Sequence, residues 1–186
     1  MPLAVRFLLS LVSTNRPDSW QQLPLPGHEN KEMPDSESRD GNMTETNGNF
    51  EVGGRNPSMQ DVFDKWLQAF GGAWQAGNAD DIVGLFDQDG SWFETPFGPP
   101  VKGAAAIRDH WEQALQGQGD IVFMYRMLAT NSDMGVARWA AQFDLLESGV
   151  RVECDGIIEC RLTAGGKARV ARIWWHNREA PKRKNT

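Results

Sequence analysis

The chain has 186 residues, of which 40% are hydrophobic and 24% charged, values typical of a globular domain. Its formal net charge of −6 lacks the basic excess that nucleic-acid-binding domains usually carry. No apolar run approaches the roughly 18 residues of a membrane span. We therefore expect neither a nucleic acid nor a membrane among its partners.

Composition divides the chain into a domain and two tails. Residues 15–58 are rich in Asn, Ser, Pro, Gly, Asp and Glu, so they cannot bury enough apolar surface to offset the entropy lost on ordering. We predict a mostly disordered tail over residues 1–56; a targeting segment at its start, or a later start of translation at Met43 or Met59, are alternatives. The domain is predicted over residues 57–179, followed by a short basic tail, residues 180–186.

The domain begins with three predicted helices. Apolar residues recur at helical spacing after Ser58, a candidate N-cap, and Gly77 marks the end of this first helix. Its apolar face comprises Met59, Val62, Phe63, Trp66, Leu67, Phe70, Ala73 and Trp74. The pair Gly71-Gly72 within it indicates a bend or a close approach to another segment. The third helix is predicted to begin after Gly103.

Strands are predicted for most of the remaining domain. A short second helix is expected to run through Phe86, with a strand at about residues 90–95. Four longer strands follow the third helix, and the short turns between them favour an antiparallel meander. Their ranges are about 121–130, 134–147, 150–163 and 167–178. Helices followed by an antiparallel sheet predict an α+β fold.

Alternation along residues 150–163 assigns side chains to two faces of the sheet. Cys154 has the apolar parity, whereas Glu153 and Asp155 have the opposite one and are expected to pair with arginines on neighbouring strands. Cys154 and Cys160 lie six residues apart on one strand, about 20 Å, too far for a disulfide. Two unpaired cysteines favour a reducing compartment, and we expect the protein in the cytoplasm.

The outer face of the predicted sheet is more apolar than a monomer requires. Ile157 and Trp174 both fall on the parity opposite to the core. Exposed apolar residues that gather in this way are typical of an interaction surface. A second copy of the chain is the simplest partner, so we predict a homodimer packed through the outer sheet face.

Several short motifs occur in a fixed order between the helices. They lie within WQAGNADDIVGLFDQDGSWFETPFGPPVKGAAAIRDHW and comprise the helix break Ala76-Gly77-Asn78, the helix end Leu85-Phe86, the strand end before Pro96, and Gly103-x-x-x-Ile107. Together they resemble the nuclear transport factor 2-like superfamily, in particular its SnoaL-like and steroid Δ-isomerase-like branches. The resemblance covers about residues 58–179.

This resemblance implies a cone-shaped, curved antiparallel β-sheet wrapped around three N-terminal helices, with a hydrophobic pocket inside. Members of the superfamily include isomerases, cyclases and epoxide hydrolases, and others only bind, so the fold does not decide the function. Steroid isomerisation is not expected here. The positions of that enzyme's general base, oxyanion-hole tyrosine and protonated aspartate hold Thr95, Phe70 and Ile158, which cannot supply its chemistry.

Three residues are candidates for catalysis. His110 lies on the apolar face of the third helix and would face the pocket as a base or donor; the alternative is a core histidine bonded to a backbone carbonyl. Thr95 shares the parity of Phe93 and is expected to face the pocket. Glu94 shares the parity of Trp92 and is expected to face away as a surface acid, unless the strand end twists it to the rim.

The predicted pocket is aromatic and suits a flat, apolar small molecule. Candidate ligand-binding residues are Phe70, Trp74, Phe93, Trp111, Trp139, Phe143, Cys154, Ile158 and Trp175. The three histidines of the chain lack the paired spacing of a metal site, and no Gly-rich loop suits a nucleotide. We therefore expect neither a metal nor a cofactor.

Three functions remain open. The first is a pocket that binds a small hydrophobic ligand, with an isomerase, cyclase or hydrolase type of activity, and the second is a non-catalytic dimerisation or assembly module. A polar pair inside the pocket would favour the first, and a filled apolar interior the second. The third, an epoxide hydrolase-like site, would need Arg138, Asp155 and Arg172, whose parity places them outside the cone.

Overall fold

The computed structural model describes residues 57–180. The helices of this region are α2 (Met59–Gln75), α3 (Ala79–Gly84) and α4 (Ala104–Gln116), and the strands are β1 (Phe86–Phe93), β2 (Val101–Lys102), β3 (Gln118–Thr130), β4 (Met134–Leu145), β5 (Val150–Leu162) and β6 (Ala168–Glu179). Apart from Ala180, the predicted tails lie outside the described residues. None of the described helices is long and apolar enough to cross a bilayer.

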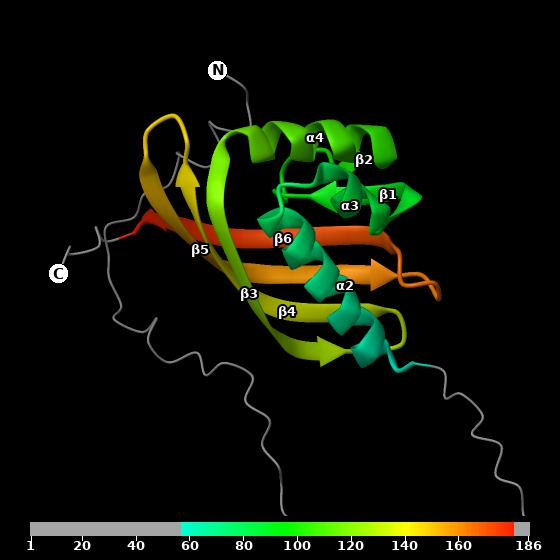
Figure 1. The fold of residues 1–186 in the computed structure, drawn as a ribbon. Helices are drawn as coiled ribbons and strands as arrows, with labels where there is room; N and C mark the ends of the chain where they lie inside the picture. Colours follow the sequence, from blue (N-terminus) through cyan, green and yellow to red (C-terminus); the bar gives the residue numbers. More distant parts are fainter. Residues whose placement is uncertain (1–56, 181–186) are drawn as a thin grey trace, which may run out of the picture. The chain divides into compact units, whose positions relative to one another are not determined.

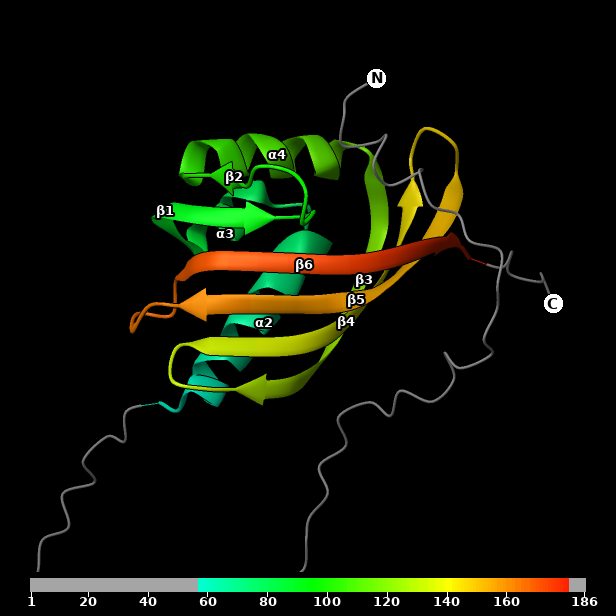
Figure 2. The same ribbon diagram turned by 180° about the vertical axis from the view of Figure 1, so that it is seen from behind.

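The described strands form one curved sheet in the order β2-β1-β6-β5-β4-β3 (Figure 1). Strands β3 to β6 pair antiparallel, as the predicted meander requires, whereas β1 pairs with β2 antiparallel and with β6 in parallel. The sheet is therefore mixed, and β1–β6 is its only parallel pair among the described strands. The helices pack on one face of the sheet, and Figure 2 looks onto the face that no described helix covers. The α+β class is confirmed.

The second helix is shorter than its apolar pattern predicts. It ends at Gly84, and Phe86 already belongs to β1, so the prediction of a helix through Phe86 was wrong. Pairing with β6 explains the early start of the strand, because the N–H of Ala168 donates to the carbonyl of Leu85 at 2.8 Å. That bond joins residues far apart in the chain, so local periodicity carries no sign of it.

A capping box fixes the start of α2, as its sequence indicates. The hydroxyl of Ser58 accepts from the N–H of Asp61 at 3.2 Å, and the Asp61 carboxylate accepts from the N–H of Ser58 at 3.0 Å. These two bonds satisfy donors that the first turn of a helix otherwise leaves free. They orient the helix that carries the largest apolar face of the domain.

Aromatic rings fill most of the space between the helices and the sheet. Phe70, on α2, is fully buried, and stacked or edge-to-face ring pairs contribute about 0.5–1.5 kcal/mol each beyond their burial. The rings whose centroids lie 5.3–5.9 Å from that of Phe70 are those of Trp66, Trp74, Trp92, Trp111 and Phe123. The core is thus one continuous aromatic cluster, centred on α2.

Gly71 allows β3 to approach α2 closely. A Cβ atom at Gly71 would lie 2.4 Å from Cδ1 of Phe123, whereas one at Gly72 would meet nothing within 4 Å. Of the two interpretations of this glycine pair, a close approach is confirmed at Gly71.

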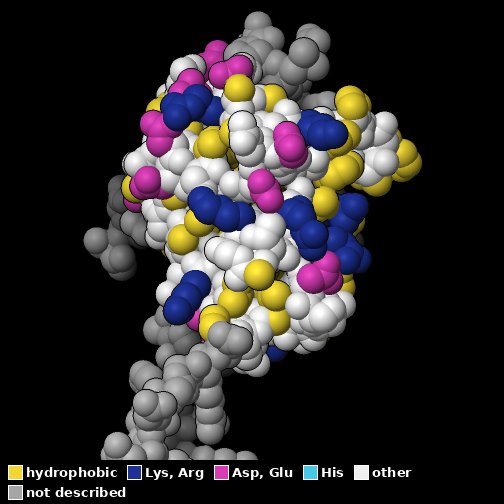
Figure 3. Space-filling view, turned by 90° about the vertical axis from the view of Figure 1, so that its right-hand side faces the viewer, with side chains coloured by type: hydrophobic (Ala, Val, Ile, Leu, Met, Phe, Trp, Pro, Cys, Tyr) yellow, Lys and Arg dark blue, Asp and Glu magenta, His cyan; other side chains and the backbone are white. Residues whose placement is uncertain are grey.

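Charged side chains pair across the strands on the face away from the helices. The pairs are Arg138–Asp155, Arg172–Glu159 and Arg178–Glu153, joined at 2.8–2.9 Å. The predicted pairing of Glu153 and Asp155 with arginines is confirmed. Trp174 is 41% exposed, as its parity predicts. On the molecular face drawn in Figure 3, basic and acidic side chains are interspersed with small groups of hydrophobic ones.

Strand β5 carries both cysteines on the core side of the sheet. Cys154 and Cys160 are 1% and 0% exposed, and both are free, as their spacing predicts. Burial raises the pKa of Cys154 to about 12, with a smaller contribution from the charge of Glu153, and burial raises the pKa of Cys160 well above its ordinary value. Both side chains are therefore neutral thiols at physiological pH.

Gly71→Ala and Gly72→Ala form a matched pair of variants. Gly72→Ala is expected to raise the free energy of unfolding by up to about 1 kcal/mol, because alanine favours the helix and its Cβ meets open space. Gly71→Ala is expected to lower it by about 1–3 kcal/mol, because the Phe123 ring has to move. Urea denaturation of both variants measures the difference, and two effects of the same sign would contradict the packing described.

Neither thiol is expected to react with iodoacetamide in the native protein, because only a thiolate is a good nucleophile. Between its ordinary pKa of 9.0 and its folded pKa of about 12, Cys154 ionises only in the unfolded chain. The free energy of unfolding should therefore fall as pH rises above about 9. Mass spectrometry of native and denatured samples measures the alkylation, and native labelling at the denatured rate would disprove the burial of the thiols.

Candidate functional site

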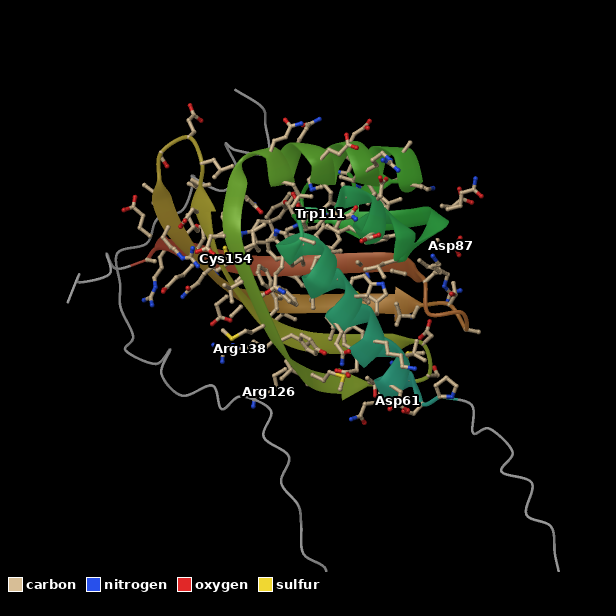
Figure 4. All side chains as sticks on the ribbon, in the orientation of Figure 1. Asp61, Asp87, Trp111, Arg126, Arg138 and Cys154 are labelled. Carbon is tan, nitrogen blue, oxygen red and sulfur yellow. The ribbon has the colours of Figure 1, made fainter. Side chains whose placement is uncertain are left out.

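A cavity lies between α4 and the covered face of the sheet. Its volume is about 60 Å³, well below the 300 Å³ or more of most drug-sized ligand sites. It is lined by Trp74, Trp92, Glu94, His110, Trp111, Ala114, Gln118, Trp139, Phe143, Cys154, Ile173 and Trp175. Trp111 and Cys154, labelled in Figure 4, belong to its helix side and its sheet side.

Glu94 and His110 form a polar pair on the wall of this cavity. The Nε2 atom of His110 lies 2.7 Å from Oε1 of Glu94, and the same oxygen accepts from Nε1 of Trp92 at 3.0 Å. An ionised carboxylate can only accept, so Nε2 carries the proton, and Nδ1 of a neutral His110 ring offers a lone pair. The side chains are 32% and 18% exposed, which places the pair where the cavity meets solvent.

Two local features of the chain bring this pair together. Strand β1 ends at Phe93, and Glu94 stands between Trp92, two residues earlier, and the turn at Pro96. On α4, the buried residues Ile107 and Trp111 face the core, and His110 lies at the edge of that buried face. The pair is therefore held by a strand end and by a helix that is anchored in the core.

The predicted directions of the residues at this strand end were wrong. Trp92 is 1% exposed and lines the cavity together with Glu94, whereas Phe93 lies on the other face, with Cζ of Arg172 5.0 Å from its ring centroid. Thr95 does not line the cavity, and its hydroxyl accepts from the N–H of Phe97 at 3.2 Å within the turn. Alternation alone could not decide the direction, because Trp92 and Phe93 are both large and aromatic.

The hydrogen-bond partner of His110 decides between a pocket residue and a core histidine bonded to a backbone carbonyl. Its ring nitrogen meets a carboxylate, not a backbone carbonyl, and the residue lines the cavity. His176 is exposed and does not line the cavity. Among residues 57–180, no group of three or more His, Cys, Asp or Glu side chains is placed to hold a metal ion.

The structure divides the predicted ligand-binding residues into two groups. Those that line the cavity are Trp74, Trp111, Trp139, Phe143, Cys154 and Trp175. Phe70 and Ile158 are fully buried in the core outside the cavity, and Phe93 lies on the opposite face of the sheet. Sequence reasoning did not select Trp92, Ala114, Gln118 and Ile173 as ligand-binding residues. Of these, Gln118 is the first residue of β3, just after the end of α4, so neither helical nor strand periodicity predicts its direction.

Five tryptophans line the cavity, and the indole N–H groups of four of them, Trp74, Trp92, Trp111 and Trp139, differ in their partners. Trp74 donates to Oε1 of Gln118 at 2.8 Å, and Trp92 donates to Glu94. The N–H groups of Trp111 and Trp139 are buried and have no hydrogen-bond partner among the described residues. Two acceptors on the wall are thus occupied by indoles, and two indole donors are unused.

Comparison with solved structures supports the fold. The epoxide hydrolase/cyclase-like enzyme SalBIII, described for pyran ring formation in polyether salinomycin, is 16% identical, with a TM-score of 0.55 over 65% of this chain and 95% of its own. RV0760c from Mycobacterium tuberculosis is 15% identical, with a TM-score of 0.58 over 67% of this chain and 100% of its own. A computationally designed 17-OHP binder is 15% identical, with a TM-score of 0.56 over 64% of this chain and 98% of its own.

Comparison with sequences assigns the family. A search of curated proteins found no match. The pattern of the SnoaL-like domain matches residues 67–173, more than half of the chain. These residues include every element from α3 to β5, the second half of α2 and the first half of β6. The match agrees with the fold and with the order of motifs in the sequence. The chain therefore belongs to the SnoaL-like domain family, within the nuclear transport factor 2-like superfamily.

Proposed function

We propose that this protein binds a small, largely apolar molecule in the aromatic cavity and that Glu94 and His110 transfer a proton to or from it. The observation that carries the proposal is the 2.7 Å contact between these two side chains on the wall of a cavity lined mainly by aromatic rings. Packing does not require a polar pair on an apolar wall, so we infer a chemical role for it.

The pair has the geometry of an acid–base couple. Glu94 uses Oε1 for two hydrogen bonds, and no donor among the described residues lies on Oε2, so this oxygen remains able to take a proton. His110 is oriented by the same contact and can relay the proton through its other ring nitrogen. A positioned base typically accelerates proton transfer by about 10²–10⁴.

The size of the cavity directs the search towards compact ligands. A volume of about 60 Å³ does not admit a polycyclic molecule unless lining side chains move. Trp175 is half-buried, and Gln118 is held by one hydrogen bond to Trp74, so these two are the side chains best placed to shift. The relatives support a small-molecule role, since SalBIII is described as an epoxide hydrolase/cyclase-like enzyme and the designed protein as a 17-OHP binder.

Two mechanisms known in the superfamily find no support in the cavity. Thr95, Phe70 and Ile158, which occupy the positions of the steroid isomerase residues, do not line it. Arg138 pairs with Asp155 outside the cavity, so the residues suggested for an epoxide hydrolase-like site do not face a ligand there. The proton transfer that we propose uses a different set of side chains.

The predicted homodimer and the cytoplasmic location stay predictions. The exposed Trp174, paired in register with Ile157 on the uncovered face of the sheet, supports self-association through that face. The free thiols of Cys154 and Cys160 support a reducing compartment. An assembly role alone would not account for the Glu94–His110 pair.

Glu94→Gln should abolish proton transfer without removing the shape of the site. With cyclopentanone in heavy water, the wild-type protein is expected to accelerate deuterium uptake beside the carbonyl, and the variant to lose about 10²–10⁴ of that acceleration. Thr95→Val is the matched control, one residue away and outside the cavity, and should keep the wild-type rate. Proton NMR follows the exchange, and equal rates for the wild type and Glu94→Gln would contradict the role of Glu94.

Trp174→Asp tests the predicted dimer. Sedimentation velocity of the wild-type protein should give twice the chain mass, and the variant should shift towards the monomer because a charge would be buried in the contact. Trp174→Phe keeps an aromatic surface and serves as the control. A wild-type monomer at all concentrations would disprove the homodimer.

A further inference from the structure

Trp92 is linked to both members of the acid–base pair. Its indole Nε1 donates to Oε1 of Glu94 at 3.0 Å, and the same oxygen lies 2.7 Å from Nε2 of His110. Its ring centroid lies 5.3 Å from that of Trp111, the residue that follows His110 on α4. One side chain of the core therefore connects the strand end that carries Glu94 with the helix that carries His110.

Building on the proposed function, we propose that Trp92 is a positioning residue for the proton transfer. Its N–H group holds Oε1 of Glu94 against His110, so that Oε2 is the oxygen that takes the proton of the ligand. Trp92 does not exchange a proton with the ligand and acts only through the carboxylate.

The indole of Trp92 is a rigid donor. The side chain is 1% exposed, and the ring centroids of Phe70, Phe86 and Trp111 lie 5.3–6.1 Å from its own. An indole nitrogen donates one hydrogen bond and accepts none, so this group cannot exchange roles with the carboxylate. The packing of the core therefore decides where the N–H group lies, before any ligand enters the cavity.

The carboxylate of Glu94 needs such a donor to stay in one arrangement. Glu94 follows the last residue of β1, and its side chain is 32% exposed. A glutamate with this much access to solvent loses rotamer freedom when it is held in place, and hydrogen bonds to a charged group offset that cost. Because both hydrogen bonds of the carboxylate fall on Oε1, one oxygen binds the protein and the other is left for the ligand.

The spacing along β1 brings the donor to the carboxylate. Trp92 and Glu94 are two residues apart, and side chains at this spacing on an extended chain point to the same side. Both line the cavity, whereas Phe93 between them lies on the other face, near Arg172. The contact therefore arises within one short segment, and α4 has only to add His110 to it.

The proposed step keeps these contacts in both charge states. With cyclopentanone, a C–H bond beside the carbonyl breaks, its electron pair moves towards the carbonyl oxygen, and the proton forms an O–H bond with Oε2 of Glu94. Oε1 is then the carbonyl oxygen of a neutral acid, which still accepts from Trp92 and His110. The reverse step returns a deuteron after Oε2 has exchanged its proton with heavy water.

Two replacements of Trp92 test its role. Trp92→Phe removes the N–H group and part of the ring, whereas benzothienylalanine at position 92 alone keeps the shape of the indole and carries sulfur in place of the N–H group. For deuterium uptake by cyclopentanone, we expect both to lower kcat about tenfold to a hundredfold, because a displaced base loses its alignment with the C–H bond. The benzothienylalanine protein should keep KM within about twofold, because the cavity wall keeps its shape.

Trp66→Phe is the matched control for these replacements. Trp66 is 2% exposed in the same aromatic cluster, but it donates to the carbonyl of Leu85 and does not line the cavity. This variant should keep the wild-type kcat. If Trp92→Phe does not fold, the benzothienylalanine protein, which preserves the packing, still decides.

Heteronuclear NMR tests the contact itself without a ligand. The indole N–H signal of Trp92 is the one that disappears in Trp92→Phe. In Glu94→Gln this signal should move upfield, because an amide oxygen accepts a weaker hydrogen bond than a carboxylate does. The signal of Trp66, whose acceptor is the Leu85 carbonyl, should stay in place. A Trp92 signal that is the same in the wild type and in Glu94→Gln would overturn the inference.

The kinetic results separate this inference from the proposed function. If the wild-type protein does not accelerate deuterium uptake, the proposed function fails and the role of Trp92 fails with it. If the wild type is active, Glu94→Gln is inactive and the benzothienylalanine protein keeps the wild-type kcat, only the role of Trp92 is disproved. An equal loss in Trp66→Phe would indicate a general effect of the aromatic core and would also overturn the inference.

Discussion

The need to bury large, rigid aromatic rings between the helices and a curved sheet governs this structure. Phe70 lies at the centre of the cluster, and α2 and β3 approach closely enough to complete it only because Gly71 has no side chain. The ring pairs of this cluster include stacked, tilted and edge-to-face arrangements. The cavity of about 60 Å³ lies where α4 and the sheet leave a gap between them.

That packing also determines the polar chemistry of the cavity. Each indole brings one donor into the interior, and the protein provides acceptors on the cavity wall for Trp74 and Trp92 but none for Trp111 and Trp139. The acceptor of Trp92 is Glu94, so the aromatic core orients the carboxylate that contacts His110. The aromatic side chains that stabilise the fold therefore also position the acid–base pair.

The fold could be predicted further from the sequence than the site. Helical periodicity, the Ser58 cap and the alternation in β5 each depend on neighbours in the chain, and the structure agrees with them. The direction of Glu94 depends on which of two adjacent aromatics, Trp92 or Phe93, turns inward, and that is decided by packing against α4 and α2. The parallel pairing of β1 with β6 and the place of Gln118 on the wall likewise arise from contacts between distant segments.

The central claim is that the aromatic cavity is a ligand site with Glu94 and His110 on its wall. A crystal structure of the protein soaked with cyclopentanone tests it most directly. We predict ligand density inside the cavity, with its atoms in contact with the Glu94–His110 pair. A cavity without ligand at saturating ketone, or ketone bound only on the molecular surface, would contradict the account.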